Sequence, residues 1–381
     1  MLDKGLVVPL AQRALQLPLI LRRKDAVTPR FREYTSDVGY DLQVFRSMLD
    51  EVDRNLVADR VAEPRDVAEL VRGAALDSQW QAFCALFDRR LVELADLVGG
   101  FDKHEHEVHG FYFRKHMWDL ILSSQFLART NLKPRGYAGD SEMMRMVYED
   151  RFVGPTVFAR FMHRHPLRSA AAQAVRNRRS LLAGMIRGRI DAQAPKGERQ
   201  AVRVLSVACG PARELGDIVA DAGVSSRVRF TLLDQDESAL AEATAEVEAV
   251  KGRTGATLDV RYVRESVRTM LRIHDLRGLW GSFDFVYSMG LFDYLTAPVA
   301  RAVLARLYQL LDDGGELIVG NFHISNQTRV YMDYWMDWVL FYRTEREMLE
   351  LAADLPGAKA SVMFEETGSQ LFLRVEKRST G

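Results

Sequence analysis

The chain of 381 residues has only two cysteines, Cys84 and Cys209, and no net charge. Two cysteines cannot build a disulfide framework, so we expect a reducing, cytoplasmic location. Because 52 basic residues balance 52 acidic ones, no overall charge directs the protein to nucleic acid or to a membrane surface. The apolar run at residues 5–24 is interrupted by Pro9, Arg13 and Pro18. It is too short to span a bilayer and lacks a basic leader, which favours a packed helix or an extended arm.

A polar stretch at residues 193–200, QAPKGERQ, divides the chain into two kinds of pattern. Before it, apolar side chains recur at helical spacing, as in Phe83, Leu86, Leu91, Leu94 and Leu97. Strand-like runs are absent there. After it, short β-branched runs alternate with amphipathic helices, which is typical of a parallel sheet with crossover helices. We therefore predict a helical N-terminal region with an active-site lid at 1–195 and a second domain at 196–381.

The second half predicts an α/β fold with seven strands. The expected strands are residues 202–208, 228–234, 256–263, 283–290, 314–322, 359–366 and 369–377, and the expected helices include 212–223, 237–250 and 298–311. A short turn at Gly368 joins the last two strands, so we expect that pair to be antiparallel.

The junction after the first strand reads VLSVACGPARE, residues 204–214. Small residues at Ala208, Gly210 and Ala212 let a ligand approach the backbone at the carboxyl end of a strand, where open α/β sheets bind nucleotides. Asp234 ends the second strand and can accept hydrogen bonds from a ribose. Glu214 repels the phosphates of a dinucleotide but suits a ligand that carries a cation. S-adenosylmethionine has a ribose, a sulfonium and no phosphate.

Together these residues resemble a class I S-adenosylmethionine-dependent methyltransferase over residues 202–377, with a Rossmann-like sheet whose last strand is antiparallel. One departure is Ser206, which stands where the family usually has an acidic residue. The resemblance implies a set of cofactor-binding residues at the strand ends. They are Ala208, Cys209 and Gly210 for the methionine part, Asp234 for the ribose, Gln235, Glu265, Ser266 and Val267 for the adenine, and Ser288, Met289 and Gly290 beside the sulfonium.

Three segments support a narrower resemblance: KPRGYAGD at 133–140, LSVACGPARE at 205–214 and YSMGLFDYL at 287–295. They are similar to the bacterial family of extracellular-factor 3-hydroxypalmitic acid methyl ester biosynthesis methyltransferases, over residues 111–322. The resemblance implies that the chain esterifies the carboxylate of a 3-hydroxy fatty acid or another small carboxylic acid, and so makes a quorum signal.

The first of these segments is a glycine-punctuated loop within a helical region. Gly136 and Gly139 permit a close approach or positive φ. Tyr137 can place its ring on the ligand and its hydroxyl on a carboxylate, or it can be a core tyrosine. Asp140 can contact the ligand's amino group, or it can only cap the helix that follows. We predict that this loop covers the active site and excludes water.

The methyl acceptor is expected at the end of the fifth strand. Methylating a carboxylate needs positioning and no strong base, because the acceptor is already anionic at neutral pH. Asn321 and His323 can hydrogen-bond such a group, and His323 can act as a base if the acceptor is a hydroxyl. The aromatic residues that follow, Tyr331, Tyr334 and Trp335, either wall an acyl pocket or fill a core. Tyr294 is a further candidate for that wall.

Two other clusters invite a functional interpretation. His104, His106, His109 and His116 lie within thirteen residues, but alternating glutamates favour a solvated turn or helix start, and we expect no metal. Residues 160–190 hold eight arginines and no acidic residue. This block is either a charged helix face or a docking site for an anionic partner such as acyl carrier protein or RNA.

The favoured hypothesis is a carboxyl O-methyltransferase that acts on a small-molecule carboxylic acid. One rival is an O- or N-methyltransferase of a secondary metabolite, with His323 as the base. Another is a non-catalytic cofactor-binding protein that dimerises through the first hundred residues. The enzyme, too, can form a homodimer through the N-terminal helices. An RNA methyltransferase is a third, and strong salt dependence of substrate binding would favour it.

Overall fold

The computed structural model describes residue 17 and residues 21–58, 65–192 and 201–378. The predicted linker at 193–200 and most of the predicted arm at 5–24 lie outside these residues. The chain forms two compact units that interleave along the sequence. The helical unit contains Met1–Pro134, Arg151–Pro166 and Arg329–Trp338, and the sheet unit contains Arg135–Asp150, Leu167–Thr328 and Val339–Gly381. The sheet unit also takes in segments that precede residue 196, namely Arg135–Asp150 and the residues from Leu167 onward. The predicted domain boundary at 195/196 stays a prediction.

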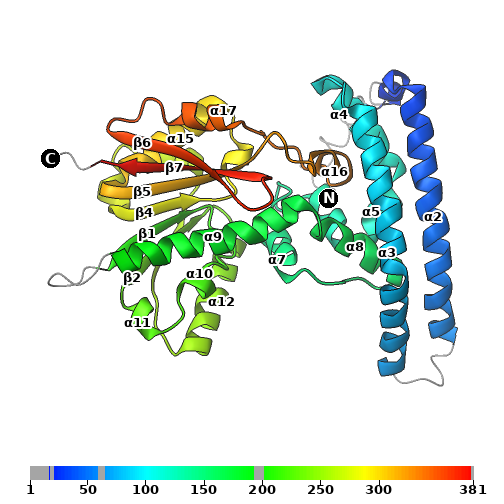
Figure 1. Ribbon diagram of the computed structural model, residues 1–381, viewed down its shortest axis with the longest axis horizontal. Coiled ribbons are helices and arrows are strands. Elements are labelled where there is room, and N and C mark those ends of the chain that lie inside the picture. The colour runs from blue at the N-terminus through cyan, green and yellow to red at the C-terminus, as the bar shows by residue number, and fades with distance from the viewer. Residues whose placement is uncertain (1–16, 18–20, 59–64, 193–200, 379–381) are drawn as a thin grey trace, which may run out of the picture. The chain divides into compact units, whose positions relative to one another are not determined.

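The helical unit is built around two long neighbouring helices, α2 (Pro29–Ala58) and α3 (Arg65–Val98) (Figure 1). Its other elements are η1 (Arg23–Ala26), α4 (Lys103–His116), α5 (Trp118–Ser123), α6 (Gln125–Leu132), α8 (Val157–Leu167, in this unit as far as Pro166) and α16 (Arg329–Trp335). Asp102 starts α4 with a capping box, in which its side chain accepts the Glu105 backbone N–H and the Glu105 side chain accepts that of Asp102. Phe31, Phe83, Phe113 and Trp335 are among its largest fully buried side chains. The predicted all-helical N-terminal region is confirmed for the described residues.

The sheet unit holds seven strands in the order β3-β2-β1-β4-β5-β7-β6. Their bounds are β1 (Val202–Val207), β2 (Val228–Asp234), β3 (Asp259–Arg264), β4 (Phe283–Ser288), β5 (Leu311–Phe322), β6 (Ala358–Phe364) and β7 (Gln370–Lys377). The pairs among the first five strands are parallel, whereas β7 runs antiparallel to both β5 and β6. The predicted seven-stranded sheet with a reversed last strand is therefore confirmed.

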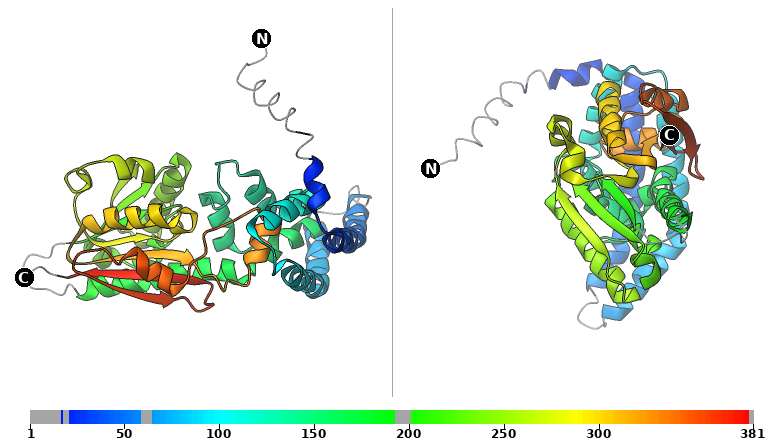
Figure 2. Two further views of the ribbon diagram at one scale, coloured as in Figure 1. Left: turned by 90° about the horizontal axis from the view of Figure 1, so that it is seen from above. Right: turned by 90° about the vertical axis from the view of Figure 1, so that its left-hand side faces the viewer.

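Helices cover both faces of this sheet (Figure 2). One core lies between the strands and helices α9 (Ala170–Ala192), α10 (Leu215–Ile218) and α12 (Glu237–Thr254). The other core includes side chains from α13 (Val267–Arg272), α14 (Leu276–Trp280), α15 (Ala297–Gln309) and α17 (Glu345–Leu351). The central strands β1, β2, β4 and β5 are mostly buried on both faces, as parallel strands with crossover helices are. The edge strands β3 and β6 are largely exposed. None of the described helices combines the length and the hydropathy that a membrane span needs.

The predicted helix at 212–223 is wrong in its extent. The structure has two short helices there, α10 and α11 (Ala222–Ser225). Ala212 has φ of 48°, outside the helical region. Val219 is extended, and the Asp221 side chain accepts the Val224 backbone N–H to start α11. The apolar periodicity was correct, but capping groups and a left-handed residue divide the segment.

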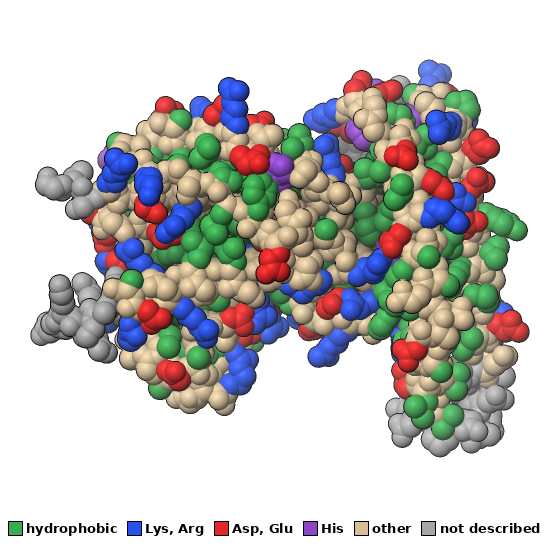
Figure 3. All heavy atoms as spheres, viewed as in Figure 1, with side chains coloured by type: hydrophobic (Ala, Val, Ile, Leu, Met, Phe, Trp, Pro, Cys, Tyr) green, Lys and Arg blue, Asp and Glu red, His purple; other side chains and the backbone are tan. Residues whose placement is uncertain are grey.

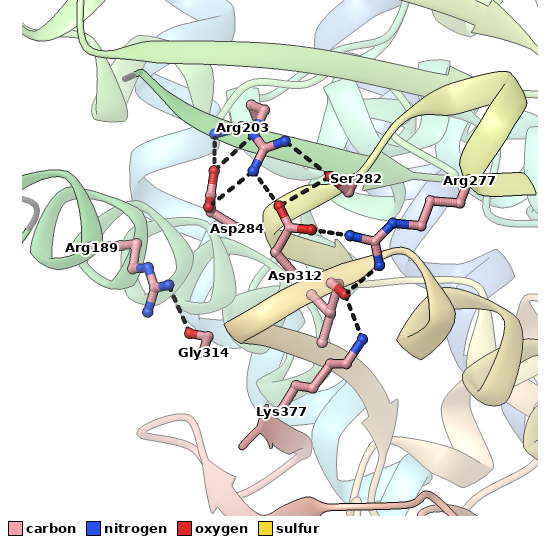
Figure 4. Close-up of polar contacts among 9 residues, drawn as sticks. Arg189, Arg203, Arg277, Ser282, Asp284, Asp312, Gly314 and Lys377 are labelled. Carbon is pink, nitrogen blue, oxygen red and sulfur yellow. Dashed lines mark hydrogen bonds and ion pairs between the residues drawn. The ribbon is translucent and has the colours of Figure 1, made fainter. Parts of the chain in front are cut away.

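A polar network pins the amino ends of the central strands (Figure 4). Arg203 at the start of β1 donates to Asp284 in β4, with an Nε–Oδ2 distance of 3.2 Å, and also bonds Asp312 in β5. Ser282 Oγ lies 3.0 Å from Asp312 Oδ2, and Arg277 pairs with the same carboxylate. The network lies at the edge of the sheet opposite to the carboxyl ends of these strands, and therefore leaves that end available for a ligand.

We expect Asp312→Asn to lower the free energy of unfolding at pH 7 by about 1 kcal/mol, the scale of a partly exposed ion pair within a network. Burial alone would raise the pKa of Asp312, but hydrogen bonds from Arg203 and Ser282 hold it below its ordinary value. The stabilising contribution is therefore present above the unfolded pKa near 4 and is lost as the pH falls through the lower folded pKa. Urea unfolding at pH 7 and pH 3 measures this. Exposed Asp354→Asn is the control, and an equal difference between wild type and Asp312→Asn at both pH values would contradict the assignment.

Candidate active site at the carboxyl edge of the sheet

The loop after β1 has an unusual backbone. Ala208, Gly210 and Ala212 have φ of 54°, 54° and 48°, a region that residues with a side chain rarely adopt. A Cβ placed on Gly210 would meet no atom within 4 Å. Ala208 is exposed, while Cys209 is buried. The loop thus presents its backbone to open space at the carboxyl end of β1, which fits a ligand that packs against the chain there.

Asp234, the last residue of β2, organises this loop. Its Oδ2 accepts the Gly210 backbone N–H at 3.0 Å, and its Oδ1 accepts the Asp236 backbone N–H at 3.0 Å. Burial raises the pKa of Asp234, while these backbone hydrogen bonds act in the opposite direction. Each carboxylate oxygen still has a lone pair. The carboxylate is therefore fixed in place and can accept hydrogen bonds from a ribose.

The ends of β3 and β4 carry the other predicted cofactor residues. The Glu265 backbone N–H donates to the Asp234 carbonyl at 3.2 Å, and Ser266 caps α13, which begins at Val267. Gln235 is exposed. Ser288 Oγ donates to the Val207 carbonyl at 2.8 Å and so joins β4 to β1. Met289 and Gly290 follow β4, Met289 being buried and Gly290 half-buried.

The loop predicted to cover the site belongs to the sheet unit. Arg135 pairs with Asp236 at 3.1 Å and with Glu242 at 3.3 Å, and Ser141 Oγ donates to Glu242 at 2.7 Å. Asp236 and Glu242 lie at the cap and in the first turns of α12, directly after Asp234. This latch of Arg135, Ser141, Asp236 and Glu242 holds residues 135–141 at the carboxyl end of β2.

Tyr137 and Asp140 lie in the same loop. The Tyr137 ring packs edge-on against Tyr294, with 6.3 Å between ring centroids. Burial raises the pKa of Tyr137, and the nearby carboxylate of Asp234 raises it further. Asp140 is fully buried and caps α7 (Ser141–Glu149), accepting the Met143 backbone N–H at 2.9 Å. Tyr137 and Tyr294 are thus brought together with the cofactor loop, and Asp140 has at least its predicted capping role.

We expect Arg135→Gln to weaken the binding of S-adenosylhomocysteine by about three- to tenfold, because the latch holds the loop over the site through surface-type ion pairs. Calorimetry at 0.05 M and 0.5 M salt tests this. Wild-type affinity should fall with salt towards that of the variant, since salt screens the latch. Arg145→Gln is the matched control, because Arg145 pairs with Glu142 and Glu149 inside α7. Equal losses in the two variants would refute the latch.

A buried acid pair lies beside the loop. Tyr287 OH donates to Glu214 Oε1 at 2.6 Å. Burial raises the pKa of both groups, so that the pair keeps its protons more strongly than exposed groups would. The sequence suggested Glu214 as a group facing a cationic ligand. The structure shows that this carboxyl has a protein partner, which the residue order alone did not reveal.

The two residues predicted to act on the acceptor are engaged in protein contacts. Asn321 is fully buried, and its Nδ2 donates to the Phe322 and Phe341 carbonyls at 2.8 and 2.9 Å, while its Oδ1 accepts from Arg343. His323 has Nδ1 2.6 Å from Ser325 Oγ and Nε2 3.1 Å from Glu345 Oε2. These contacts give Asn321 and His323 a structural part in the loop after β5; their catalytic roles stay predictions.

Sequence reasoning missed Asp293, which follows β4 in the LFDYL segment. Its Oδ1 accepts the Phe322 backbone N–H at 2.7 Å. Burial raises the pKa of Asp293 to about 7, whereas that hydrogen bond and the guanidinium groups of Arg178 and Arg343 act in the opposite direction. An aspartate among apolar neighbours, followed by a tyrosine, gave no sequence signal of this burial.

Tyr331, Tyr334 and Trp335 lie in the helical unit, where they are buried. The Tyr331 hydroxyl bonds His165 Nδ1 at 2.9 Å, and the Tyr334 hydroxyl bonds His106 Nδ1 at 3.0 Å. The Trp335 ring packs between the rings of Phe87 and Phe113 at 4.8 and 5.0 Å. The hydroxyls and rings of these residues thus contact other side chains of the protein, which favours the interpretation that they fill a core. A role in the wall of an acyl pocket stays a prediction.

The histidine cluster has a structural explanation. His109 is buried, accepts the Thr28 backbone N–H at 3.1 Å and bonds the Glu105 carbonyl at 2.8 Å. His116 bonds the Tyr112 carbonyl. Within the described ranges, no three or more His, Cys, Asp or Glu side chains are grouped as a metal site would require.

The arginine block is also used internally. Arg160 pairs with Glu69, Arg179 with Asp217, and Arg176 donates to the Val147 and Leu167 carbonyls. On the face shown in Figure 3, basic and acidic side chains are interspersed. These bonds favour a structural role over docking of an anionic macromolecule.

Comparison with known proteins agrees with this geometry. Residues 204–315 match the family model described as a methyltransferase domain. No curated protein matches the chain. The matched segment contains the loop after β1, Asp234 and the end of β4. Residues 204–315 therefore belong to a methyltransferase domain, whose methyl donor is S-adenosylmethionine. The open backbone at Gly210 beside the fixed Asp234 carboxylate fits that donor.

Solved structures give weaker likenesses. A possible exported protein from Bordetella parapertussis is 18% identical, with 79% of this chain and 97% of that chain covered and a TM-score of 0.47. Magnesium protoporphyrin IX methyltransferase from Synechocystis, with bound S-adenosylmethionine, is 13% identical, with 55% and 83% covered and a TM-score of 0.36. The N-methyltransferase NodS from Bradyrhizobium japonicum, with S-adenosylhomocysteine, is 14% identical, with 54% and 88% covered and a TM-score of 0.36. Nothing about the acceptor of this protein follows from likenesses of this size.

Proposed function

We propose that this S-adenosylmethionine-dependent methyltransferase esterifies the carboxylate of a small or fatty acid of the 3-hydroxy acyl type, and that the methyl ester serves as a quorum signal. The three segments that carry the narrower family resemblance support this. Tyr137 comes from the first, the loop at Ala208–Gly210 from the second and Tyr294 from the third. The rings of Tyr137 and Tyr294 are in contact, and Tyr137 lies near the Asp234 carboxylate.

The observation that carries the choice of a carboxylate acceptor is the engagement of the candidate base. Both ring nitrogens of His323 lie within hydrogen-bond distance of side chains, Ser325 and Glu345. A hydroxyl acceptor needs a group that removes its proton. A carboxylate is already anionic at neutral pH and needs only alignment with the methyl group and exclusion of water.

In this proposal the cofactor supplies an electrophilic methyl group, and the chain's residues position it. Asp234 holds the ribose and the loop at Ala208–Gly210 holds the methionine part. Tyr137 covers the site and excludes water, and Tyr294 borders the acceptor. The hydroxyl of Tyr137 keeps its proton at neutral pH, because burial raises its pKa. It can donate a hydrogen bond to one carboxylate oxygen of the acceptor, leaving the other oxygen to attack the methyl group.

Incubation with methyl-labelled cofactor and a panel of acids tests this function. The panel contains 3-hydroxypalmitic acid, palmitic acid and shorter 3-hydroxy acids, and mass spectrometry identifies the products. We expect label that mild base releases as methanol, which is typical of an ester. Base-stable label on nitrogen or in an ether would overturn the carboxylate assignment, and binding without any transfer would favour the non-catalytic alternative.

We expect His323→Gln to change kcat with a carboxylic acid less than about threefold, since a carboxylate acceptor needs no base. Gln keeps one donor and one acceptor for Ser325 and Glu345. The rate should also vary little between pH 6 and pH 8. If the rate fell a hundredfold or more in this variant while thermal unfolding stayed normal, His323 would be the base of a hydroxyl or amine methyltransferase.

Two further parts of the proposal concern location and assembly. Cys84 and Cys209 are buried thiols rather than a disulfide, which supports a reducing cytoplasm. Exposed Tyr40, Val44 and Met48 recur every four residues on α2, and support a homodimer through the N-terminal helices. Sedimentation equilibrium of the wild type and of Val44→Lys tests the dimer: a monomeric wild type would refute it.

A further inference from the structure

Arg178 is a buried cation whose hydrogen-bond partners are neutral. Arg178 lies on α9 and is only 7% exposed. Its Nη1 donates to the Met289 carbonyl at 3.1 Å, and its Nη2 lies 3.5 Å from the Met144 sulfur. The Tyr148 hydroxyl is a third hydrogen-bond partner. None of the three partners carries charge, and a thioether is a weak acceptor. Among the described residues, no carboxylate forms an ion pair with Arg178, although arginines elsewhere on α9 and in the block before it do so.

An unpaired buried charge is costly, and proteins compensate for it with an opposite charge or a ligand. Two carboxyls, those of Glu214 and Asp293, interact electrostatically with Arg178 but do not supply that charge fully. Glu214 accepts the hydrogen bond from Tyr287, and burial raises its pKa. Asp293 accepts the Phe322 backbone N–H, and burial raises its pKa to about 7. The positive charge of Arg178 lowers the pKa of both carboxyls, but burial raises it more. Neither carboxyl therefore readily becomes the negative charge that would balance Arg178.

The position of Arg178 is at the centre of the carboxyl edge. Met289 directly follows β4, and Met144 lies in α7, the helix that follows the Tyr137 loop. A Cβ on Gly290 would lie 3.9 Å from Nη2 of Arg178. Met289 and Gly290 are the residues predicted to flank the sulfonium. On that prediction, the guanidinium lies beside the methionine part of the donor.

We propose that Arg178 binds a carboxylate inside the methyl-transfer site. Two carboxylates belong there: that of the methionine part of the cofactor, and that of the acceptor acid if the proposed function holds. The second source rests on the proposed function, whereas the first does not. In either case Nη1 remains tied to Met289, so that the free donors of the guanidinium can fix one carboxylate oxygen. For an acceptor this leaves the other oxygen to attack, and the contribution of Arg178 is to position the acid.

The cofactor source is tested by calorimetry with two ligands, S-adenosylhomocysteine and 5′-methylthioadenosine, which lacks the amino-acid carboxylate. If Arg178 binds the cofactor, Arg178→Met lowers the affinity for S-adenosylhomocysteine ten- to a hundredfold and leaves that for 5′-methylthioadenosine within twofold. Arg178→Lys, which keeps the charge but not the fork, should recover part of the loss. Arg187→Met is the matched control, since Arg187 also lies on α9 and donates to a carbonyl, that of Ile218.

The acceptor source is tested with 3-hydroxypalmitic acid as the probe, in enzyme saturated with cofactor. If Arg178 binds the acceptor, Arg178→Met binds S-adenosylhomocysteine normally but raises the KM for the acid at least tenfold, and Arg187→Met does not. The proposed function fails if wild type transfers label to no acid. The Arg178 proposal fails if Arg178→Met matches wild type both in its affinity for S-adenosylhomocysteine and in its KM for the acid. It also fails if the variant loses affinity equally for S-adenosylhomocysteine and 5′-methylthioadenosine, as a disturbed fold would.

Discussion

Asp234→Asn is expected to weaken the binding of S-adenosylhomocysteine by about 10- to 150-fold, which corresponds to the ~1.5–3 kcal/mol that hydrogen bonds to a charged group contribute. The Asp234 oxygens each accept one backbone N–H, from Gly210 and Asp236. An amide in the same place keeps one acceptor, but its NH₂ group faces a backbone N–H and cannot accept a ribose hydroxyl. The variant thus loses a ligand contact and disturbs the loop after β1. Calorimetry with the purified protein measures the change.

The control for this experiment is Glu237→Gln, which removes a carboxylate three residues further on, from an exposed side chain at the start of α12. It should bind like wild type within about twofold. Thermal unfolding without ligand shows whether Asp234→Asn still folds. If the folded variant bound S-adenosylhomocysteine as tightly as wild type, the ribose would not be held at the end of β2.

The second large effect concerns stability and pH at Asp293. Its folded pKa is about 7, whereas an unfolded aspartate titrates near 3.9. Between these values the folded state holds a proton that the unfolded state has released, so the contribution of Asp293 to stability decreases as the pH rises from about 4 to about 7. At 1.36 kcal/mol per pKa unit the full loss is on the order of 4 kcal/mol. Asp293→Asn keeps an oxygen for the Phe322 N–H and does not ionise. It should match wild type near pH 4 and be more stable by a few kcal/mol at pH 8.

Urea unfolding at several pH values gives this difference directly, and other titrating groups cancel in the comparison. Arg178 and Arg343 are the charged groups that act on Asp293, and both remain in the variant. Asp354→Asn again serves as the exposed control. Curves for Asp293→Asn and wild type that stay parallel from pH 4 to pH 8 would show that Asp293 is ionised throughout, and the buried-acid assignment would be wrong.

The fold was largely readable from local patterns, because alternating buried strands and amphipathic helices define a doubly covered parallel sheet. β2 has the predicted bounds, and β7 differs from the prediction by one residue. The prediction of one continuous helix at 212–223 was wrong, because helical periodicity cannot reveal a left-handed alanine or a new cap at Asp221. Tertiary hydrogen bonds decide such details, and they are not encoded in spacing.

The sequence predicted which residues lie at the carboxyl ends of the strands, but not how they bond to one another. Gly210 and Asp234 lie together and are joined by a hydrogen bond that the sequence did not predict, and their cofactor roles stay predictions. Asn321 and His323 were chosen because they follow β5, but the residues that engage them come from distant segments, such as Arg343 and Glu345. Arg178 was visible only as one arginine among eight. Its distinction is burial without an ion pair among the described residues, which only the folded chain shows.

The interleaving of the two units limits how the protein can be divided. The chain passes from one unit to the other after Pro134, Asp150, Pro166, Thr328 and Trp338. A polypeptide that starts at residue 196 would keep every strand but lose the Tyr137 loop, α7 and the helix that carries Arg178. Such a fragment would expose apolar side chains, Val202 and Val204 among them, that share one core with Ile186 and Ile190. Truncation between the sequence halves should therefore give insoluble material rather than a smaller working enzyme.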